Sequence, residues 1–149
     1  MKRHLIVPDT QIRPGVPTEH IDWAAQAIVE YLPDVVIHLG DHWDFASLNS
    51  HSEKGSEELE GRRYQDDIDS GNKAFRRLDA PMSAEMARRK RNKSKYWTPR
   101  KVFLRGNHEQ RADRVAKNDP KWAGVIGSHN CQTLDWEVVP FLQVAVIDG

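Results

Sequence analysis

The chain is poor in cysteine and in long apolar runs, and each shortage narrows the structures it can form. It contains one cysteine, Cys131, among 149 residues, so no internal disulfide can form and a reducing compartment is expected. No apolar stretch is long enough to span a bilayer. The polar start, Met1-Lys2-Arg3-His4, leads at once into a strand and leaves no room for a signal peptide. These features predict a cytoplasmic protein with no membrane contact.

Two common catalytic patterns are also absent. The chain has no G-x-S-x-G pattern of a serine hydrolase and no Walker-type phosphate loop. No helix or base pattern around Cys131 indicates an activated thiol, so a buried or loop cysteine is expected. The chemistry must therefore be sought among other side chains.

The composition is that of a single globular domain. Hydrophobic residues make up 38% and charged residues 30%, and the length suits one domain with a sizeable core. Lysine and arginine together number 22, as do aspartate and glutamate, so the formal net charge is zero. The charges are nevertheless distributed unevenly along the chain.

Three short apolar runs predict buried strands, at residues 3–8, 35–39 and 101–104. Between the first two, apolar residues at helical spacing predict a helix that begins after Thr18 and ends before Pro33. This order of strand, helix and strand indicates a right-handed βαβ unit.

A longer helical pattern runs from Ser56 to Met86, with a kink expected near Pro81. A short polar helix is expected over residues 109–118, and the C-terminal stretch WEVVPFLQVAVIDG is β-rich. We therefore predict an α/β fold, layered, with a central mixed β-sheet and flanking helices.

Each of the three predicted strands ends in a polar cluster. The clusters are Asp9-Thr10-Gln11, Gly40-Asp41-His42-Trp43-Asp44 and Gly106-Asn107-His108-Glu109. In open α/β sheets, sites form beyond the carboxyl ends of the strands, so these side chains are expected to converge if the strands are neighbours. Facing carboxylates repel one another unless cations lie between them, and carboxylate, amide and imidazole groups together suit a two-metal site. The alternative is ordinary turns, which also favour Asp, Asn and Gly.

In this order, PDTQ, GDHWD and GNHE resemble the first three motifs of the calcineurin-like metallophosphoesterases. The sequence around them also resembles uncharacterised phosphoesterases common in bacteriophage genomes, which would place the protein in the host cytoplasm. The resemblance implies one calcineurin-like domain over residues 1–149, covering the N-terminal portion of the family's layered sandwich.

The resemblance also implies an activity, which is hydrolysis of phosphate esters by a hydroxide that two divalent metal ions activate. The basic segment described below favours a phosphodiesterase or nuclease. By motif, it implies that Asp9 and Gln11 bind the first metal, that Asp41 bridges the two metals and that Asn107 binds the second. It also implies that His108 donates a proton and that Asp44 orients this histidine.

The chain departs from the family in two places. The family has histidine at the position of Gln11, and an amide oxygen there favours Mn²⁺, with Mg²⁺, Fe²⁺, Zn²⁺ and Ni²⁺ as alternatives. The later histidines of the family, including a G-H-x-H pattern, are missing, since only His129 follows His108.

Asp148-Gly149 is typical of a hairpin turn whose second strand is absent. We therefore expect a truncated member, completed by a C-terminal segment or a second chain. The alternative is a catalytically incomplete remnant that binds nucleic acid or a partner.

Residues 88–105 form a basic run that contains Tyr96 and Trp97 and no acidic residue. Basic and aromatic side chains together suit a nucleic-acid backbone and its bases. The alternative is a solvated connection that balances the acidic stretch at residues 53–69. Because the run leads into the strand before Asn107, its charge is expected to reach a phosphate near the site.

For the other side chains in and near the clusters, the sequence predicts either contact with substrate or a structural role. His42 and Arg105 are expected to contact the phosphate of the substrate, His42 from the rim of the site. Trp43 either joins His42 there or packs against the following loop. His4 and His38 are expected to be structural, and Glu109 is expected to cap the next helix rather than to bind metal.

Overall fold

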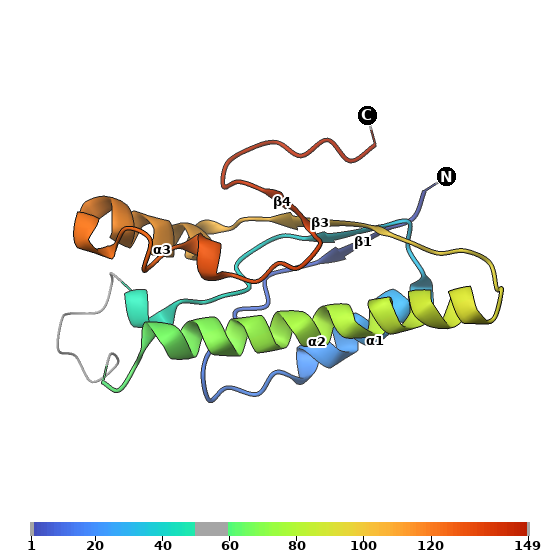
Figure 1. Cartoon of the computed structure of the whole chain (residues 1–149), viewed down its shortest axis with the longest axis horizontal. Helices are drawn as coiled ribbons and strands as arrows, with labels where there is room; N and C mark the ends of the chain where they lie inside the picture. Colours follow the sequence, from blue (N-terminus) through green and yellow to red (C-terminus); the bar gives the residue numbers. More distant parts are fainter. Residues whose placement is uncertain (1, 50–59, 149) are drawn as a thin grey trace.

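The computed structural model describes residues 2–49 and 60–148, in which one sheet is flanked by helices (Figure 1). The strands are β1 (His4–Val7), β2 (Val35–His38), β3 (Arg100–Leu104) and β4 (Glu137–Val139). The α-helices are α1 (Glu19–Tyr31), α2 (Tyr64–Arg91) and α3 (Asn107–Asn118). Three short 3-10 helices within these ranges are η1 (Ala46–Leu48), η3 (Pro120–Trp122) and η4 (Ser128–Asn130).

The described strands form one sheet in the order β1-β2-β3-β4, and every pair is parallel. The α/β class is confirmed, whereas the prediction of a mixed sheet is wrong for these strands. The chain leaves β3 through α3 and the short helices before it reaches β4, so β4 enters the sheet in the same direction as its neighbour. The register pairs Val7 with His38 and His38 with Phe103, so the first three strands end side by side.

Helices α1 and α2 cover one face of this sheet (Figure 1). Of the apolar positions predicted for the first helix, Ile21, Ala25 and Ile28 are buried there, as their helical spacing requires, and Ala24 and Leu32 are partly buried. The core on this side includes Val7, Val36 and Phe103 from the strands, Ile21, Ala25 and Ile28 from α1, and Phe75, Leu78 and Met82 from α2. None of the helices in residues 2–49 and 60–148 combines the length and apolar character needed to cross a membrane.

Helix α2 differs in two ways from its prediction. It begins at Tyr64, so residues 60–63 are not helical as predicted, while residues 56–59 lie outside the described residues. It continues through Pro81, as expected, but ends at Arg91 rather than Met86. Its Gly71 lies against Trp43, since a Cβ atom there would be 2.0 Å from the indole Cδ1. A glycine within a helix costs stability, and here it allows α2 to pack closely on the residues that follow β2.

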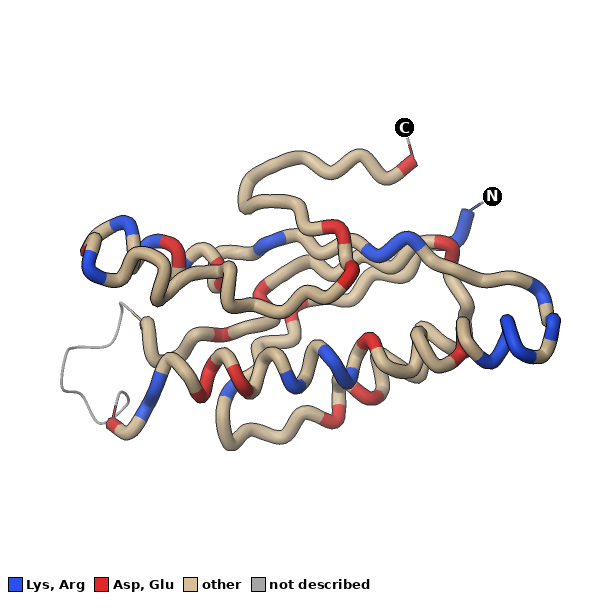
Figure 2. The backbone as a smooth tube through the Cα atoms, in the orientation of Figure 1, with Lys and Arg blue, Asp and Glu red and all other residues tan. Residues whose placement is uncertain are grey.

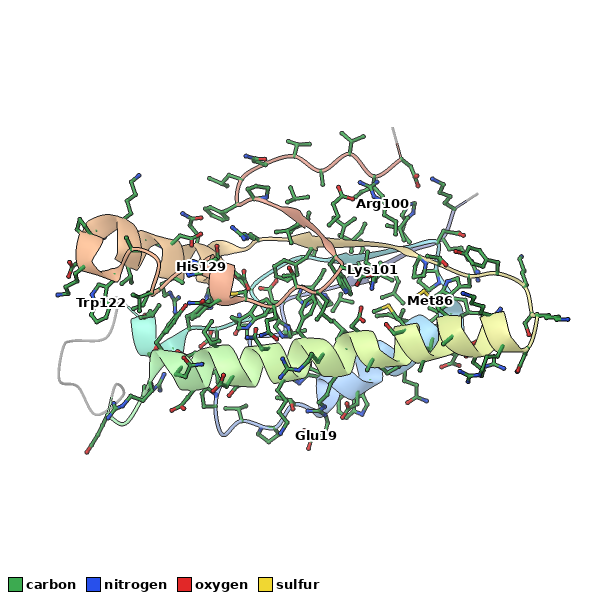
Figure 3. The ribbon with its side chains drawn as sticks, in the orientation of Figure 1. Glu19, Met86, Arg100, Lys101, Trp122 and His129 are labelled. Atoms are coloured by element: carbon green, nitrogen blue, oxygen red, sulfur yellow. The ribbon has the colours of Figure 1, made fainter. Side chains whose placement is uncertain are left out.

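Lys101 lies between β3 and α2 and is buried, although it belongs to the basic run (Figure 3). Its Nζ is 2.8 Å from Oδ1 of Asp79 on α2 and also pairs with Asp135. Burial raises the pKa of Asp79, but hydrogen bonds from Lys101 and Trp136 outweigh burial and lower it overall. This lysine therefore contributes to packing of the sheet on α2, not to a solvated basic surface.

The opposite face of the sheet is less well covered. Val35, Val102 and Val139 are buried there against Ala145 and Ile147 of the C-terminal stretch. On the same stretch, side chains at alternate positions point to solvent, and they are Leu142, Val144 and Val146. In the described part of the C-terminal stretch, 136–148, only Glu137–Val139 forms a strand. The prediction that this stretch is rich in β-structure therefore holds for three of its residues.

Candidate functional site

The segments that follow β1, β2 and β3 meet at Asp41. Its carbonyl oxygen accepts a hydrogen bond of 2.9 Å from the backbone N–H of Gln11, and its Oδ1 accepts one of 2.8 Å from the N–H of His108. Asp41 is 8% exposed and has a positive φ of 48°, which is costly for a residue other than glycine. The predicted convergence of the three polar clusters is therefore found, and Asp41 is its centre.

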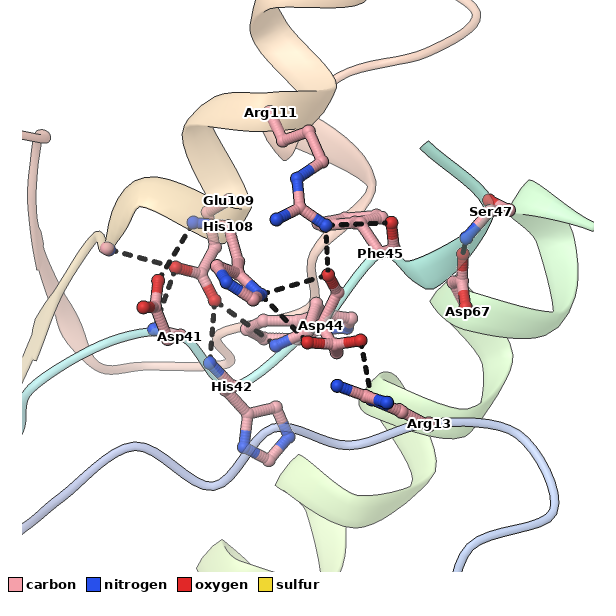
Figure 4. Close-up of polar contacts among 12 residues, drawn as sticks. Arg13, Asp41, His42, Asp44, Phe45, Ser47, Asp67, His108, Glu109 and Arg111 are labelled. Atoms are coloured by element: carbon pink, nitrogen blue, oxygen red, sulfur yellow. Dashed lines mark hydrogen bonds and ion pairs between the residues drawn. The ribbon is translucent and has the colours of Figure 1, made fainter. Parts of the chain in front are cut away.

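Glu109 is fully buried and holds two of these segments together (Figure 4). Its Oε2 accepts N–H bonds from Asp41 (3.0 Å) and Gly106 (2.9 Å), and its Oε1 accepts them from His42 (2.8 Å) and Trp43 (3.2 Å). Burial raises the pKa of Glu109, and the backbone donors only partly oppose this shift. The expected helix cap is present at Gly106, but the larger role of Glu109 is to order the loop after β2.

His108 lies in the first turn of α3, and its ring contacts Asp44 (Figure 4). Its Nδ1 is 3.0 Å from the carbonyl oxygen of Asp44 and 2.9 Å from Oδ1, where the geometry is that of an ion pair. The contact with Asp44 raises the pKa of His108, against the effects of burial and of Arg111. Burial alone would raise the pKa of the Asp44 carboxyl, but the bond to His108 and the charge of Arg13 lower it overall. The predicted pairing of His108 with Asp44 is found in the structure.

Two arginines that the sequence did not single out approach Asp44 from opposite sides (Figure 4). The Nε of Arg13 is 2.7 Å from Oδ2 of Asp44, and Nη1 of Arg111 donates to the carbonyl oxygens of Asp44 and Phe45 at 3.1 and 3.3 Å. Arg111 was detectable as the residue one helical turn after His108, on the same side of α3. Arg13 gave no such signal, because it lies in an irregular loop.

The residues predicted to bind metal all lie at this edge of the sheet. Asp41 is mostly buried, whereas Asp9, Gln11 and Asn107 are exposed beside it. Within residues 2–49 and 60–148, no group of three His, Cys, Asp or Glu side chains is placed to hold a metal ion. Two carboxylates and two amides offer only oxygen donors, which fits Mg²⁺ or Mn²⁺ better than Zn²⁺. The described residues therefore place oxygen donors at this edge of the sheet without a complete group of metal ligands.

The prediction that His42 contacts substrate from the rim is wrong, because its side chain is fully buried. Its Nε2 donates to the carbonyl of Gly71 at 3.0 Å, and its Nδ1 is 2.6 Å from the hydroxyl of Thr10, which also meets His38. Burial, the larger cause, lowers the pKa of His42 to about 4, so the ring is neutral at pH 7. Trp43 is also buried, against α2, and His38 has the structural role expected of it.

Arg105 and the basic run do not join the cluster around His108. The guanidinium of Arg105 lies 3.9 Å from Asp113. Residues 88–99 lie at the amino end of β3, at the other end of the sheet from α3 (Figures 1 and 2). The prediction that the charge of these residues reaches the site is wrong, because the length of strand β3 separates them from the site at its carboxyl end. Of the two aromatic residues in the run, Tyr96 is 82% exposed, while Trp97 is buried and donates to Pro33.

Comparison of this chain with protein-family models, with curated proteins and with solved structures found no match.

Proposed function

We propose that this chain is the N-terminal part of a metal-dependent phosphoesterase of the calcineurin-like family. The observation that supports this most directly is the hydrogen-bonded unit at the sheet edge. It joins the backbone of Gln11 and His108 to Asp41, and it sets His108 against Asp44. Ordinary turns need no buried carboxylate such as Glu109 to bind successive N–H groups of a neighbouring loop.

In this proposal, Asp9, Gln11, Asp41 and Asn107 would hold two divalent ions, which supply Lewis acidity and lower the pKa of water. His108 donates a proton to the leaving oxygen of the ester. Its contact with Asp44 increases the fraction of protonated imidazole near neutral pH, as a general acid requires. Asp44 orients the ring, and Arg13 and Arg111 hold Asp44 in place.

The test is hydrolysis of bis(p-nitrophenyl) phosphate with added Mn²⁺. We expect Asp41→Asn to lower the rate by about a hundredfold or more, since it removes a carboxylate that would hold the ions. Asp69→Asn, an exposed position on α2, is the matched control and should leave the rate unchanged. Activity that survives Asp41→Asn, or that persists in EDTA, contradicts the proposal.

A second candidate function is a catalytically incomplete remnant that binds nucleic acid or a partner. It is favoured by the lack of a group of three His, Cys, Asp or Glu ligands in the described part of the chain. Hydrolysis by neither the unaltered protein nor Asp41→Asn, together with tight and salt-sensitive DNA binding, supports this alternative. Gain of hydrolysis on adding a segment or second chain that contains a G-H-x-H pattern supports the phosphoesterase.

A further inference from the structure

A hollow of about 420 Å³ opens beside His108, on the side that faces Asp44. We call it the arginine hollow, and the residues that line it are Arg13, Asp44, Ala46, Asn49, Arg62, His108 and Arg111. Its volume lies within the roughly 300–1,000 Å³ that small-molecule sites occupy. Neither Asp41 nor Asn107 lines it, so it is distinct from the proposed position of the metals.

The charges that face the arginine hollow favour an anion. Three arginines and one histidine line it, from the loop after β1, the residues before α2 and the first two turns of α3. Asp44 supplies the one carboxylate among the described residues that line it. That carboxylate is already compensated, because Arg13 lies 2.7 Å from one oxygen and His108 lies 2.9 Å from the other. The hollow therefore carries an excess of positive charge.

Donor groups also remain for a ligand. Arg13 contacts Asp44 through Nε, and Arg111 binds two carbonyl groups through Nη1. A guanidinium has five N–H donors in a planar fork that matches two oxygens of a phosphate. Arg62 also borders a neighbouring hollow with Asp66 and Asp67, where burial raises the pKa of Asp67 and the charge of Arg62 partly opposes that larger effect. Within residues 2–49 and 60–148, no ion pair joins the guanidinium of Arg62 to either carboxylate.

We propose that the arginine hollow binds a second phosphate group of the substrate, next to the phosphate that is hydrolysed. The inference rests on the proposed function, in which the reacting phosphate lies between Asp41, Asn107 and His108. His108 borders both places, so two phosphates joined by one short linkage span them. The substrate class is an ester or anhydride with neighbouring phosphates, either a nucleic-acid strand or a small oligophosphate.

The test measures binding in EDTA by titration calorimetry, so that it depends on neither metal nor catalysis. The probes are orthophosphate, pyrophosphate and a 5′-phosphorylated thymidine dinucleotide. We expect pyrophosphate to bind more tightly than orthophosphate, and Arg62→Gln to weaken pyrophosphate binding by roughly tenfold and to reduce that preference. Arg63→Gln, the adjacent exposed arginine outside the hollow, is the matched control and should change neither value.

A second pair of variants tests the arginine hollow independently of any structural change that Arg62→Gln causes. Arg111→Gln should weaken pyrophosphate binding, whereas Arg114→Gln, exposed on the same helix, should not. If the dinucleotide binds more tightly than pyrophosphate, the second phosphate comes from a nucleic-acid strand, and the reverse order indicates an oligophosphate. Equal affinities in Arg62→Gln and Arg63→Gln, or no binding by the unaltered protein, overturn the inference. Loss of pyrophosphate binding in Arg62→Gln, with no hydrolysis by the unaltered protein, supports phosphate binding in the arginine hollow and contradicts only the proposed function.

Discussion

The two ends of the parallel sheet are both rich in charge, but they use it in opposite ways. At the carboxyl ends of the strands, Asp41, Asp44 and Glu109 are buried and bonded to backbone N–H groups, arginine or histidine. At the amino ends, most of the charges lie nearer the surface, as in the pair between Arg100 and Glu137 or that between Arg88 and Glu85. The buried pair between Lys101 and Asp79 is the exception.

The difference shows that charge density along the sequence is a poor guide to the position of a site. The densest basic run of the chain forms a turn with mostly exposed side chains at the amino end (Figure 2). The cationic hollow at the carboxyl end is instead assembled from arginines at positions 13, 62 and 111. Buried charges need partners from several elements, so they mark a place where the fold converges.

The largest effect is expected for Glu109→Gln. The amide keeps one oxygen but presents an NH₂ group to backbone N–H donors that the carboxylate now binds, and each buried unsatisfied donor costs about 1–3 kcal/mol. We expect the free energy of unfolding to fall by about 3 kcal/mol, measured by urea denaturation. Glu137→Gln makes the same change at the amino end, where the exposed pair should contribute less than about 1 kcal/mol. Equal losses in the two variants contradict the comparison.

A smaller loss is expected for Gly106→Ala, because a Cβ atom at this position would lie 2.0 Å from Oδ1 of Asp41. Overpacking of this kind costs about 1–3 kcal/mol, and it should also displace the carboxylate proposed to bridge the metals. We expect reduced stability to urea and reduced Mn²⁺-dependent hydrolysis. Ser94→Ala, in the exposed basic turn, should change stability by less than about 0.5 kcal/mol. Wild-type stability in Gly106→Ala is the outcome that counts against the close contact.

The next effect concerns the dependence of stability on pH. The contact with Asp44 raises the pKa of His108 in the folded state above its ordinary value of 6.5. The contribution of this contact to the free energy of unfolding is therefore fully present below about pH 6.5 and is lost as pH rises through the folded-state pKa of His108. His108→Gln should destabilise the protein most at low pH, and the difference should shrink at higher pH. NMR titration should give a lower His108 pKa in Asp44→Asn, and an unchanged value contradicts the pairing.

The smallest effect on stability is expected for replacing Lys90, Lys93 and Lys95 together by glutamine. No partner of their ammonium groups is found in the described part of the chain, so each change should alter the free energy of unfolding by less than about 0.5 kcal/mol. If the turn binds DNA, the triple variant should lower affinity and reduce the salt dependence of binding, measured by fluorescence anisotropy. A large loss of folding stability would show that this turn is not the solvated surface described above.

Much of the framework around the site was predictable from local patterns. The short apolar runs indicated β1, β2 and β3, and the spacing from Ile21 to Ile28 indicated the buried side of α1. The polar residues after each strand indicated a common edge, because parallel strands place their carboxyl ends together. Hydrophobic periodicity is a local property, so one sequence is enough to detect it.

Other features were missed or misplaced because they depend on contacts between distant residues. Glu109 looked like a helix cap, since nothing local shows that it also binds the N–H groups of residues 41–43. His42 was expected at the rim of the site, yet its side chain is buried and bonds to the carbonyl of Gly71, the glycine that leaves space for Trp43. Lys101 belongs to a basic run for which a solvated connection was one interpretation, yet its side chain is buried and pairs with Asp79 on α2.

By itself, the sequence determined that this protein is α/β, that its first three strands end in polar clusters, and that Asp41 and His108 are the residues to examine. Only the tertiary structure decided which charges surround them. The bond that joins Asp41 to Glu109 spans 68 residues, and Arg13 reaches Asp44 from the loop after another strand. Burial makes such distant pairings necessary, because a charge removed from water is stable only beside the partners that the fold brings to it.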